Sequence, residues 1–461
     1  MPRLLASAAG AFCAMLAACG GGSGNGGGAS PGGCSDTREK RFVLDAAREW
    51  YLFDDQLPEQ VDTGIYASAA ELLDALTAEA RADGKDRFFS YLTTRQQDDS
   101  ILQAGQFIGF GFRTRIEGDR LWLTDVYEDS PAEDGGLVRG VEITEIDAGD
   151  GFIPVATILA QDPALEDAFG PSTEGTERGM RFVLPGGGTA EAVFTKQLVE
   201  ITPLAGGGPA VLPLPANPTV PVGYLNLRSF ISTAGEPLRD AYAAFRAQGI
   251  EYFIFDLRYN SGGLVSVAEL IGDLNGAARD DADVYLEMRF NDRKATGNDV
   301  VRRFQPQAES VAPVRIAFIT TGLTASASEI VINSLAPWVE VAIVGDDTLG
   351  KPVGQSAFDL SGCDLRLRLI SFQFTNADGQ GGYYDGLAST LPFACRAEDD
   401  LGQAPGDAAE SSTAEALSWL GSGVCTEVLT AGGGLSKGEA RMRIPQLRRP
   451  AAAQVYLPGL Y

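Results

Sequence analysis

Hydrophobic positions recur at two different spacings along the chain and divide it into regions of different secondary structure. Between residues 35 and 102 the spacing is helical. The two clearest apolar stripes are Phe42, Val43, Ala46, Ala47 and Trp50, and then Ala69, Leu72, Leu73 and Leu76. Because each stripe would lie on one face of a helix, the pattern predicts a small helical N-terminal domain over 35–102.

Short β-rich runs broken by glycine replace this pattern between residues 103 and 200. The run IGFGF at 108–112 precedes a strand candidate, LWLTDVY, and then SPAEDGGL, which favours the start of a short helix. A β-rich module over 103–200 is therefore predicted. The Pro/Gly-rich segment that follows, residues 201–220, is interpreted as a linker.

Strand and helix patterns then alternate from residue 221 to residue 395. The predicted order is strand VGYLNLRSF, helix PLRDAYAAFRAQG, strand YFIFDLRY, helix GLVSVAELIGDLN, strand VRIAFIT, helix SASEIVINSLAPW and strand VEVAIVG. A later run, LRLRLISFQF, alternates like a half-exposed strand. This alternation predicts a layered α/β domain over 221–395, followed by a partly regular tail over 396–461.

The 461 residues include 36 basic and 62 acidic side chains, for a formal charge of -26. Nucleic-acid binding needs clustered Lys and Arg, so this composition argues against a nucleic-acid partner. A hydrophobic content of 44% fits a chain with two or three buried cores.

The first residues have the anatomy of a secretory signal: Arg3, an apolar run and small residues before Cys19. The four residues 16–19, LAAC, resemble a bacterial lipobox, which implies cleavage after residue 18 and acylation of Cys19. Residues 1–18 are then a signal peptide and 19–34 a Gly/Ser-rich tether. The alternative is a non-lipidated signal with an incidental cysteine.

Four cysteines remain after the signal and Cys19 are set aside: Cys34, Cys363, Cys395 and Cys425. An even number suits two disulfides in an oxidising compartment, with three possible pairings that the sequence leaves open. A zinc site is the alternative, but no CxxC pair is present. No apolar stretch after the signal reaches the roughly 20 residues of a membrane span.

The chain contains no histidine, which excludes Ser-His-Asp and Cys-His catalysis. A hydrolase would then need another base, and lysine is the obvious one. Ser326 lies at the predicted start of a helix, and Lys351 follows the next strand. Ligands collect beyond the C-terminal ends of strands in open α/β sheets, which is where Ser326 and the turn Asn260–Gly263 are expected.

Three motifs in this order, DLRYNSGG, TASASEI and GKPVGQ, closely resemble the carboxyl-terminal processing (tail-specific) proteases, family S41. The segment AREWYLFDDQLP also looks like the opening of such peptidases, and 103–200 resembles a PDZ domain. The resemblance implies a multidomain α/β protein: a helical N-terminal domain, a PDZ-like β-rich module and a crotonase-like layered catalytic domain. It also implies a nucleophile at Ser326, a base at Lys351 and a base-orienting Gln355.

The backbone N–H groups of Ala327 and of Gly262 or Gly263 are then expected to form the oxyanion hole. The PDZ resemblance implies a peptide-binding loop of Ile108, Gly109, Phe110, Gly111 and Phe112. Other readings stay open at this stage. Ser326 and Glu329 form a helix-capping pattern, Lys351 could be a solvated loop residue, the glycines could be only a turn, and Ser328 is a rival nucleophile.

The predicted function is a Ser-Lys endopeptidase that cleaves exported proteins or peptides near their C-termini, with the PDZ-like module recognising or gating substrate. No metal and no cofactor are predicted. The expected location is the periplasm or outer membrane, with the lipid anchor in the membrane. The alternatives are a non-proteolytic protein on the same scaffold that binds peptides or small hydrophobic ligands, and a scaffold in which only the PDZ-like module acts.

Overall fold

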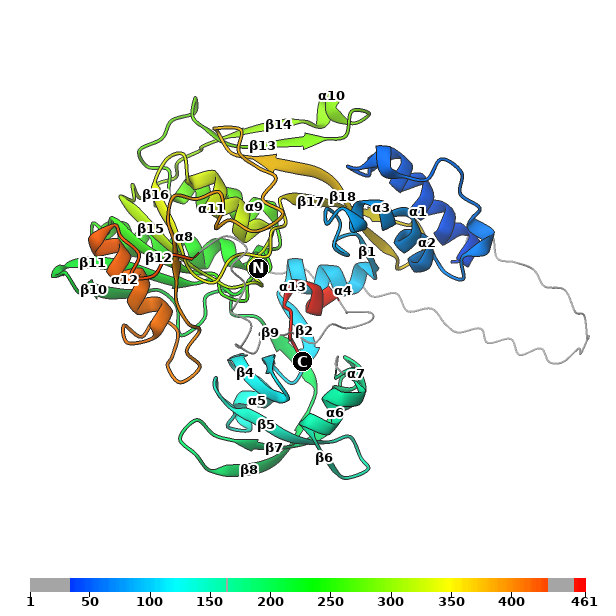
Figure 1. The fold of residues 1–461 in the computed structure, drawn as a ribbon, viewed down its shortest axis with the longest axis horizontal. Coiled ribbons are helices and arrows are strands. Elements are labelled where there is room, and N and C mark those ends of the chain that lie inside the picture. The colour runs from blue at the N-terminus through cyan, green and yellow to red at the C-terminus, as the bar shows by residue number, and fades with distance from the viewer. Residues whose placement is uncertain (1–33, 163–164, 430–451) are drawn as a thin grey trace, which may run out of the picture.

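The computed structural model describes residues 34–162, 165–429 and 452–461. Together these residues fold into a helical, a layered α/β and a β-rich region, which are in contact (Figure 1). Helices near the N-terminus cover one side, a layered α/β domain forms the bulk, and a β-rich module projects from it. The predicted multidomain α/β fold with a helical N-terminal region is confirmed. The predicted signal peptide, Cys19 and nearly all of the tether lie outside the described residues.

The helical region begins where Ser35 caps α1 by accepting a hydrogen bond from the Arg38 N–H. Its helices are α1 (Asp36–Trp50), α2 (Ala69–Leu76), α3 (Ala78–Ala82) and α4 (Arg95–Asp99), followed by one π-helical turn (Ser100–Ala104). The predicted apolar stripes are its core, with Val43 and Leu72 fully buried. The same core includes Leu367 and Ile370 of the layered α/β domain, so the helices cover a sheet of that domain.

A six-stranded sheet organises the layered α/β domain. Its spatial order is β10 (Ala210–Leu214), β11 (Asn217–Asn226), β12 (Tyr252–Asp256), β15 (Arg315–Thr320), β16 (Glu340–Gly345) and β19 (Ala394–Arg396). All neighbouring pairs are parallel except the β10–β11 hairpin. Parallel strands must be covered on both faces, which explains their continuous apolar runs.

Successive side chains of the central strands enter different cores, as the two-residue period of a strand requires. Phe253 and Phe255 face the core under helices α8 (Gly235–Ala247), α9 (Val265–Leu274) and α11 (Ala327–Leu335). Ile254 faces the opposite core, where α12 (Ser411–Ser422) packs with Trp419 fully buried. The domain is therefore a three-layer structure.

A second, antiparallel sheet stands beside the first. Its order is β1 (Tyr91–Thr93), β18 (Arg366–Thr375), β13 (Val284–Phe290) and β14 (Val300–Arg303), with β17 (Val353–Asp359) also paired to β18 and short helix α10 (Ala295–Asn298) before β14. The prediction that LRLRLISFQF, residues 365–374, is half exposed is wrong, because most of β18 is buried. Helix α1 covers its apolar side, and Arg366 and Arg368 pair with the buried Asp98.

The β-rich module is built on antiparallel strands. They are β3 (Phe112–Glu117), β4 (Arg120–Val126), β5 (Glu142–Asp147), β6 (Phe152–Pro154), β7 (Glu177–Val183) and β8 (Thr189–Thr195), with the separate pair β2 (Gln106–Gly109) and β9 (Gln197–Glu200). Its helices are α5 (Pro131–Asp134), α6 (Val155–Gln161) and α7 (Glu166–Phe169). Ser130 caps α5 as the SPAEDGGL pattern predicts. We call residues 103–200 the PDZ-like module.

Two segments are more regular than the sequence indicated. The supposed linker 201–220 contains β10 and the start of β11, and the expected boundary at 395 falls inside β19. Helix α12, beyond that boundary, packs on the main sheet. The end of the chain forms α13 (Ala452–Tyr456) and then a turn, after which Leu460 pairs with Arg113 of the PDZ-like module (Figure 1).

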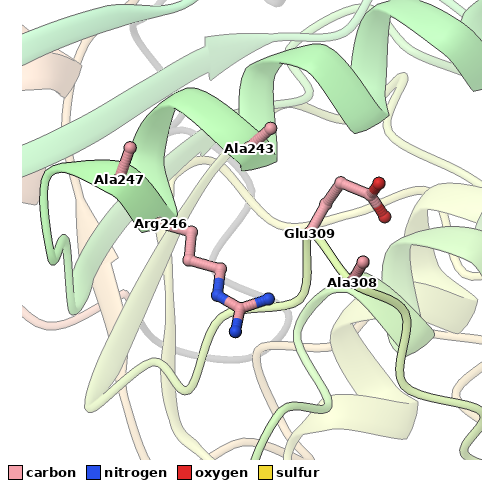
Figure 2. A pocket seen from close by; sticks show the side chains of 5 residues that line it. All are labelled: Ala243, Arg246, Ala247, Ala308 and Glu309. Carbon is pink, nitrogen blue, oxygen red and sulfur yellow. The ribbon is translucent and has the colours of Figure 1, made fainter.

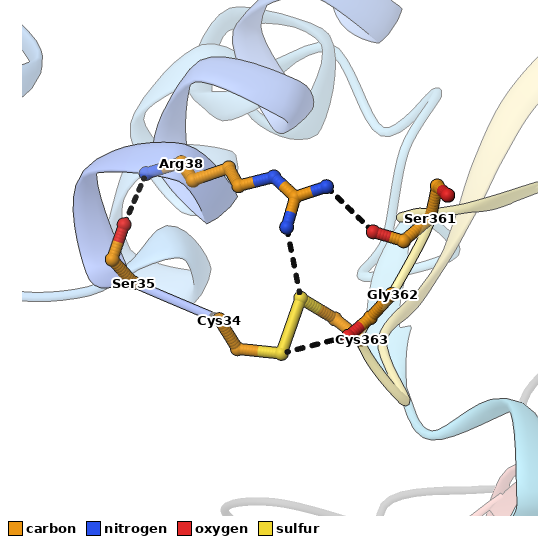
Figure 3. The surroundings of a disulfide bond; sticks show 6 residues. All are labelled: Cys34, Ser35, Arg38, Ser361, Gly362 and Cys363. Atoms are coloured by element: carbon orange, nitrogen blue, oxygen red, sulfur yellow. Dashed lines mark hydrogen bonds between the residues drawn. A yellow bond between two sulfur atoms is a disulfide. The ribbon is translucent and has the colours of Figure 1, made fainter. Parts of the chain in front are cut away.

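All four remaining cysteines are paired. Cys34 is bonded to Cys363, which ties the start of α1 to the loop before β18 (Figure 3), and Cys395 is bonded to Cys425. Arg38 flanks the first bond and donates to the Ser361 carbonyl at 2.6 Å. The four thiolates of a zinc site are thus not available. Cys395 and Cys425 also lie near Glu415, but their sulfurs bond to each other.

Among the residues that the structure describes, no helix has the length and apolar character needed to cross a membrane.

Candidate active site

Ser326 occupies a strained corner between β15 and α11. Its φ of 56° and ψ of -118° are unusual for a residue with a side chain. Such backbone conformations cost about 1–3 kcal/mol and persist where the surroundings enforce them, often at functional sites. The corner follows a buried strand and enters a helix, as expected for a reactive residue beyond a strand end.

Glu329 holds this corner and the Lys351 loop together. Its buried carboxylate accepts the Ser326 N–H at 2.9 Å and the Lys351 N–H at 2.8 Å on the same oxygen, Oε2. The other oxygen accepts the Gly350 N–H at 2.7 Å. Burial raises the pKa of Glu329, and the three N–H donors oppose that shift. One carboxylate therefore fixes the backbones of the predicted nucleophile and base against each other.

Lys351 has the environment that a basic amine requires. Burial lowers its pKa to about 8, while the nearby carboxylates Asp86 and Glu329 oppose the shift. The Nζ lies 5.0 Å from the centre of the Phe89 ring, which is one apolar wall of its site. A substantial neutral fraction near neutral pH follows, in contrast to an ordinary lysine.

Gln355 receives the Lys351 amine. Its Oε1 accepts from Nζ at 3.0 Å, and its amide nitrogen donates to the Phe89 carbonyl. The second bond fixes which way the amide faces, so its oxygen is directed at the amine. Gln355 and Lys351 are four residues apart around the start of β17.

The helical region completes the surroundings of Lys351. Asp86 is fully buried and accepts from the Tyr51 hydroxyl at 2.9 Å and from the Phe89 and Ser90 N–H groups. Burial, followed by the Asp86 charge, raises the pKa of Tyr51, so Tyr51 stays a neutral donor. Arg87 donates to the carbonyls of Leu349 and Gly350 and fixes the loop before the lysine.

The glycine corner after β12 lies directly against Ser326. A Cβ added to Gly262 would be 2.8 Å from the Ala327 nitrogen and 2.9 Å from the Ser326 Cβ, so only glycine fits there. The Gly262 N–H is used, because it donates to Asn260 Oδ1 at 2.9 Å. In the described part of the chain, the N–H groups of Gly263 and Ala327 face no hydrogen-bond acceptor.

The rival serine is engaged elsewhere. Ser328 is fully buried, and its hydroxyl donates to the Asn260 carbonyl at 2.9 Å. It therefore anchors the helix to the glycine corner. The same carbonyl accepts the Ala325 N–H at 3.2 Å.

The predicted peptide-binding loop, 108–112, spans the end of β2 and the start of β3. The N–H groups of Gly111 and Phe112 point at the carbonyl oxygen of Tyr461, at 3.0 and 3.4 Å. Phe110 and Phe112 are fully buried in the module core. The loop lies far from Ser326 in the sequence. It contacts the end of the chain through Tyr461, and the end of the chain in turn contacts the glycine corner beside Ser326.

A shallow hollow of about 400 Å³ lies on the surface beside α8 (Figure 2). It is lined by Ala243, Arg246, Ala247, Ala308 and Glu309, none of which belongs to the site described above. With one basic and one acidic side chain and no convergent polar groups, it gives no sign of a ligand.

Two contributions to the site were missed by sequence reasoning. Glu329 was interpreted only as a capping residue, although its position in the SxxE pattern was a usable signal. Asp86 and Phe89 carry no local motif, and only the packing of the helical region on β18 brings them to Lys351.

Known proteins resemble this chain in the same regions. Residues 221–390 match the description Peptidase family S41, and residues 38–91 match Peptidase S41 N-terminal domain. A carboxyl-terminal-processing protease of Synechocystis sp. is 28% identical over 264 residues, which are 57% of each chain. The chloroplastic carboxyl-terminal-processing peptidase 1 of Arabidopsis thaliana is 34% identical over 31% of this chain and 28% of its own.

These two relatives are therefore matched over less than two thirds of their length. Among solved structures, a putative S41 protease from Bacteroides fragilis superposes with a TM-score of 0.62 at 20% identity, over 82% of this chain and 96% of its own. Both family regions, in the expected order, and a shared fold agree with the geometry above. Residues 221–390 are therefore a peptidase family S41 domain, with the N-terminal domain of that family before it at 38–91.

Proposed function

We propose that the protein is a serine endopeptidase in which Lys351 activates Ser326. The observation that carries the proposal is the pair of hydrogen bonds from the Ser326 and Lys351 backbones to one Glu329 oxygen, beside a lysine whose pKa is lowered to about 8. A Ser-Lys mechanism requires a shielded lysine held close to the serine, and the shared Glu329 oxygen holds the backbones of these two residues together.

The steps follow from these groups. Neutral Lys351 takes the Ser326 hydroxyl proton as the oxygen attacks a peptide carbonyl. The negative oxygen of the tetrahedral intermediate accepts from the Gly263 and Ala327 N–H groups, each worth about 3 kcal/mol. The C–N bond then breaks as the Lys351 ammonium protonates the departing amine, which leaves an ester on Ser326. Water, deprotonated by the same lysine, attacks that ester, and the lysine returns the proton to the Ser326 oxygen as the acid product leaves.

Substrates are proposed to be exported proteins or peptides with accessible C-termini, because N–H groups of the 108–112 loop receive a main-chain carbonyl oxygen at the edge of β3, the arrangement by which such modules bind peptides. The two disulfides support an oxidising compartment. Together with the signal-like start and Cys19, they support a lipid-anchored protein of the periplasm or outer membrane.

Digestion of unfolded casein by the purified protein tests this proposal. We expect cleavage by the wild type, none by Ser326→Ala, and continued cleavage by Ser328→Ala, whose lost hydroxyl serves Asn260. Mass spectrometry of the products locates the cut sites. Absence of digestion by folded wild type would leave a binding protein on this scaffold as the better description.

Replacing Glu329 with glutamine should lower kcat about 10²-fold with little change in KM. The NH₂ group of glutamine would face at least one backbone N–H that the carboxylate now accepts, and two donors repel each other. The resulting small displacement of Ser326 relative to Lys351 is enough to lower kcat by this factor. The variant also loses a negative charge that raises the pKa of Lys351. The pH at which kcat/KM is half-maximal should therefore fall.

That pH shift separates positioning from general destabilisation, which would lower the activity at every pH alike. Thermal unfolding of the variant, measured in parallel, shows whether the protein is still folded. An unchanged kcat or an upward shift of the half-maximal pH would contradict the role given to Glu329.

A further inference from the structure

The last five residues of the chain, 457–461, form a turn closed by a hydrogen bond from the Leu460 N–H to the Leu457 carbonyl, and their final three residues pair antiparallel with the edge of β3 in the PDZ-like module. The Thr114 N–H donates to the Gly459 carbonyl at 2.8 Å, the Tyr461 N–H donates to the Phe112 carbonyl at 3.0 Å, and Arg113 pairs with Leu460. We call residues 457–461 the tail strand. Extended peptides bind sheet edges by this pattern of main-chain bonds.

The Tyr461 side chain fills an aromatic pocket in that module. Its ring centre is 4.1 Å from that of Phe169 and 6.5 Å from that of Phe112, and the residue is only 4% exposed. Its carbonyl oxygen accepts from the Gly111 and Phe112 N–H groups. These two N–H groups stand where the end of a bound peptide would be received.

Gly459 is required where the tail strand turns onto β3. Its φ is +79°, and an added Cβ would lie 2.4 Å from the Thr114 carbonyl oxygen. The pocket and this close approach together define what the groove accepts: a large aromatic residue for the pocket and glycine two residues earlier.

The tail strand also leads back to the peptidase site. The Ser261 hydroxyl, next to Gly262, donates to the Tyr456 carbonyl at 2.5 Å. The buried Arg113 donates to the carbonyls of Pro458 and Tyr259. The segment that leads into the groove therefore contacts the Asn260–Gly263 corner, which adjoins Ser326.

We propose that the tail strand occupies, in cis, the groove that receives the C-terminal segment of a substrate. The groove selects peptides in which an aromatic residue for the pocket follows a glycine by two positions, and such a substrate must displace the tail strand. Only the role of the groove in receiving substrate rests on the proposed function; occupation of the groove by the tail strand does not.

A fluorescent peptide ending in YLPGLY tests the inference by anisotropy, with the full chain carrying Ser326→Ala so that nothing is cleaved. A tethered segment competes at an effective concentration on the order of millimolar, so removal of residues 457–461 should tighten peptide binding about tenfold or more. Gly459→Ala should tighten it in the same direction. The same peptide ending in Asp should bind at least tenfold more weakly, because a charge would enter the aromatic pocket.

Gly249→Ala is the matched control, since Gly249 also has a positive φ, +64°, but an added Cβ there meets no atom within 4 Å. It should bind peptide as the intact chain does. Equal affinity of the intact, shortened and Gly459→Ala proteins would overturn the inference, as would equal affinity for the Asp peptide. If the shortened protein does not fold, the Gly459→Ala result decides.

Because this assay involves no turnover, its outcome is independent of casein digestion. Peptide displacement without digestion would reject the proposed peptidase and keep the groove. Digestion of casein with no effect of the tail strand on peptide binding would keep the proposed peptidase and reject the groove.

Discussion

Lys351→Met should reduce turnover of an unfolded protein about 10⁴-fold or more, and Ser326→Ala should do the same. Residues that act as one catalytic unit are strongly non-additive, so the double variant should be no slower than either single one. The measurement is kcat on casein for the three variants. Lys294→Met, which removes an equal charge next to Glu49, should change kcat little.

The pH dependence of kcat/KM for the wild type should report the titration of the Lys351 amine. Only the neutral form of Lys351 can accept the serine proton, so kcat/KM should rise about tenfold per pH unit below about pH 8 and level off above it. An inflection near the ordinary value of 10.5, or a decline of activity through pH 8, would contradict the assignment of Lys351 as base.

The substitution Lys351→Met should also raise the free energy of unfolding. Holding a lysine whose pKa is lowered from 10.5 to about 8 costs the folded state at neutral pH, by about 2 kcal/mol for a partly exposed group. Between about pH 8 and 10.5 the unfolded chain binds more protons than the folded one. Wild-type stability therefore rises with pH in that window, and the advantage of Lys351→Met should shrink there.

Local patterns were enough to predict the elements that carry the chemistry. Strand β15, helix α11 and strand β16 lie where their apolar runs placed them, because buried parallel strands have few alternatives. The Lys351–Gln355 contact came only from family resemblance, since a four-residue spacing outside a helix has no local geometric meaning.

The remaining features depend on contacts between distant parts of the chain. The prolines of 201–220 suggested a linker, but Pro213 and Pro221 pair at the edge hairpin of the sheet, where a missing N–H is tolerated. Likewise Glu329 meets Lys351 only when the loop before β17 folds against the start of α11, and Tyr461 meets Phe112 only when the end of the chain reaches the PDZ-like module. Neither contact leaves a periodic signal in the sequence.

Asp399→Asn should destabilise the protein by about 3–5 kcal/mol, because buried Arg139 loses its carboxylate partner and Arg115 and Arg258 each lose one of theirs. Asp399 accepts from Arg115 and Arg139 of the PDZ-like module and from Arg258 of the catalytic domain, at 2.6, 2.6 and 2.9 Å. Although burial opposes it, this arginine cluster holds the pKa of Asp399 well below its ordinary range. Unfolding in urea at pH 7 measures the loss.

The pH dependence follows from that lowered pKa. A carboxylate with a depressed pKa in the folded state stabilises fully above its unfolded value, near 3.9, and loses its contribution as the pH falls toward the folded value. The difference between wild type and Asp399→Asn should therefore be constant above about pH 5 and shrink only on stronger acidification.

Asp400→Asn is the matched control, because among the described residues the Asp400 carboxylate accepts only the Gly402 N–H, which an asparagine oxygen can also do. It should leave stability nearly unchanged. Asp399→Asn should also lower kcat, since the Tyr259 hydroxyl donates to Asp399 and Tyr259 leads directly into the Asn260–Gly263 corner. A variant as stable and as active as Asp400→Asn would show that the two domains are held together without this cluster.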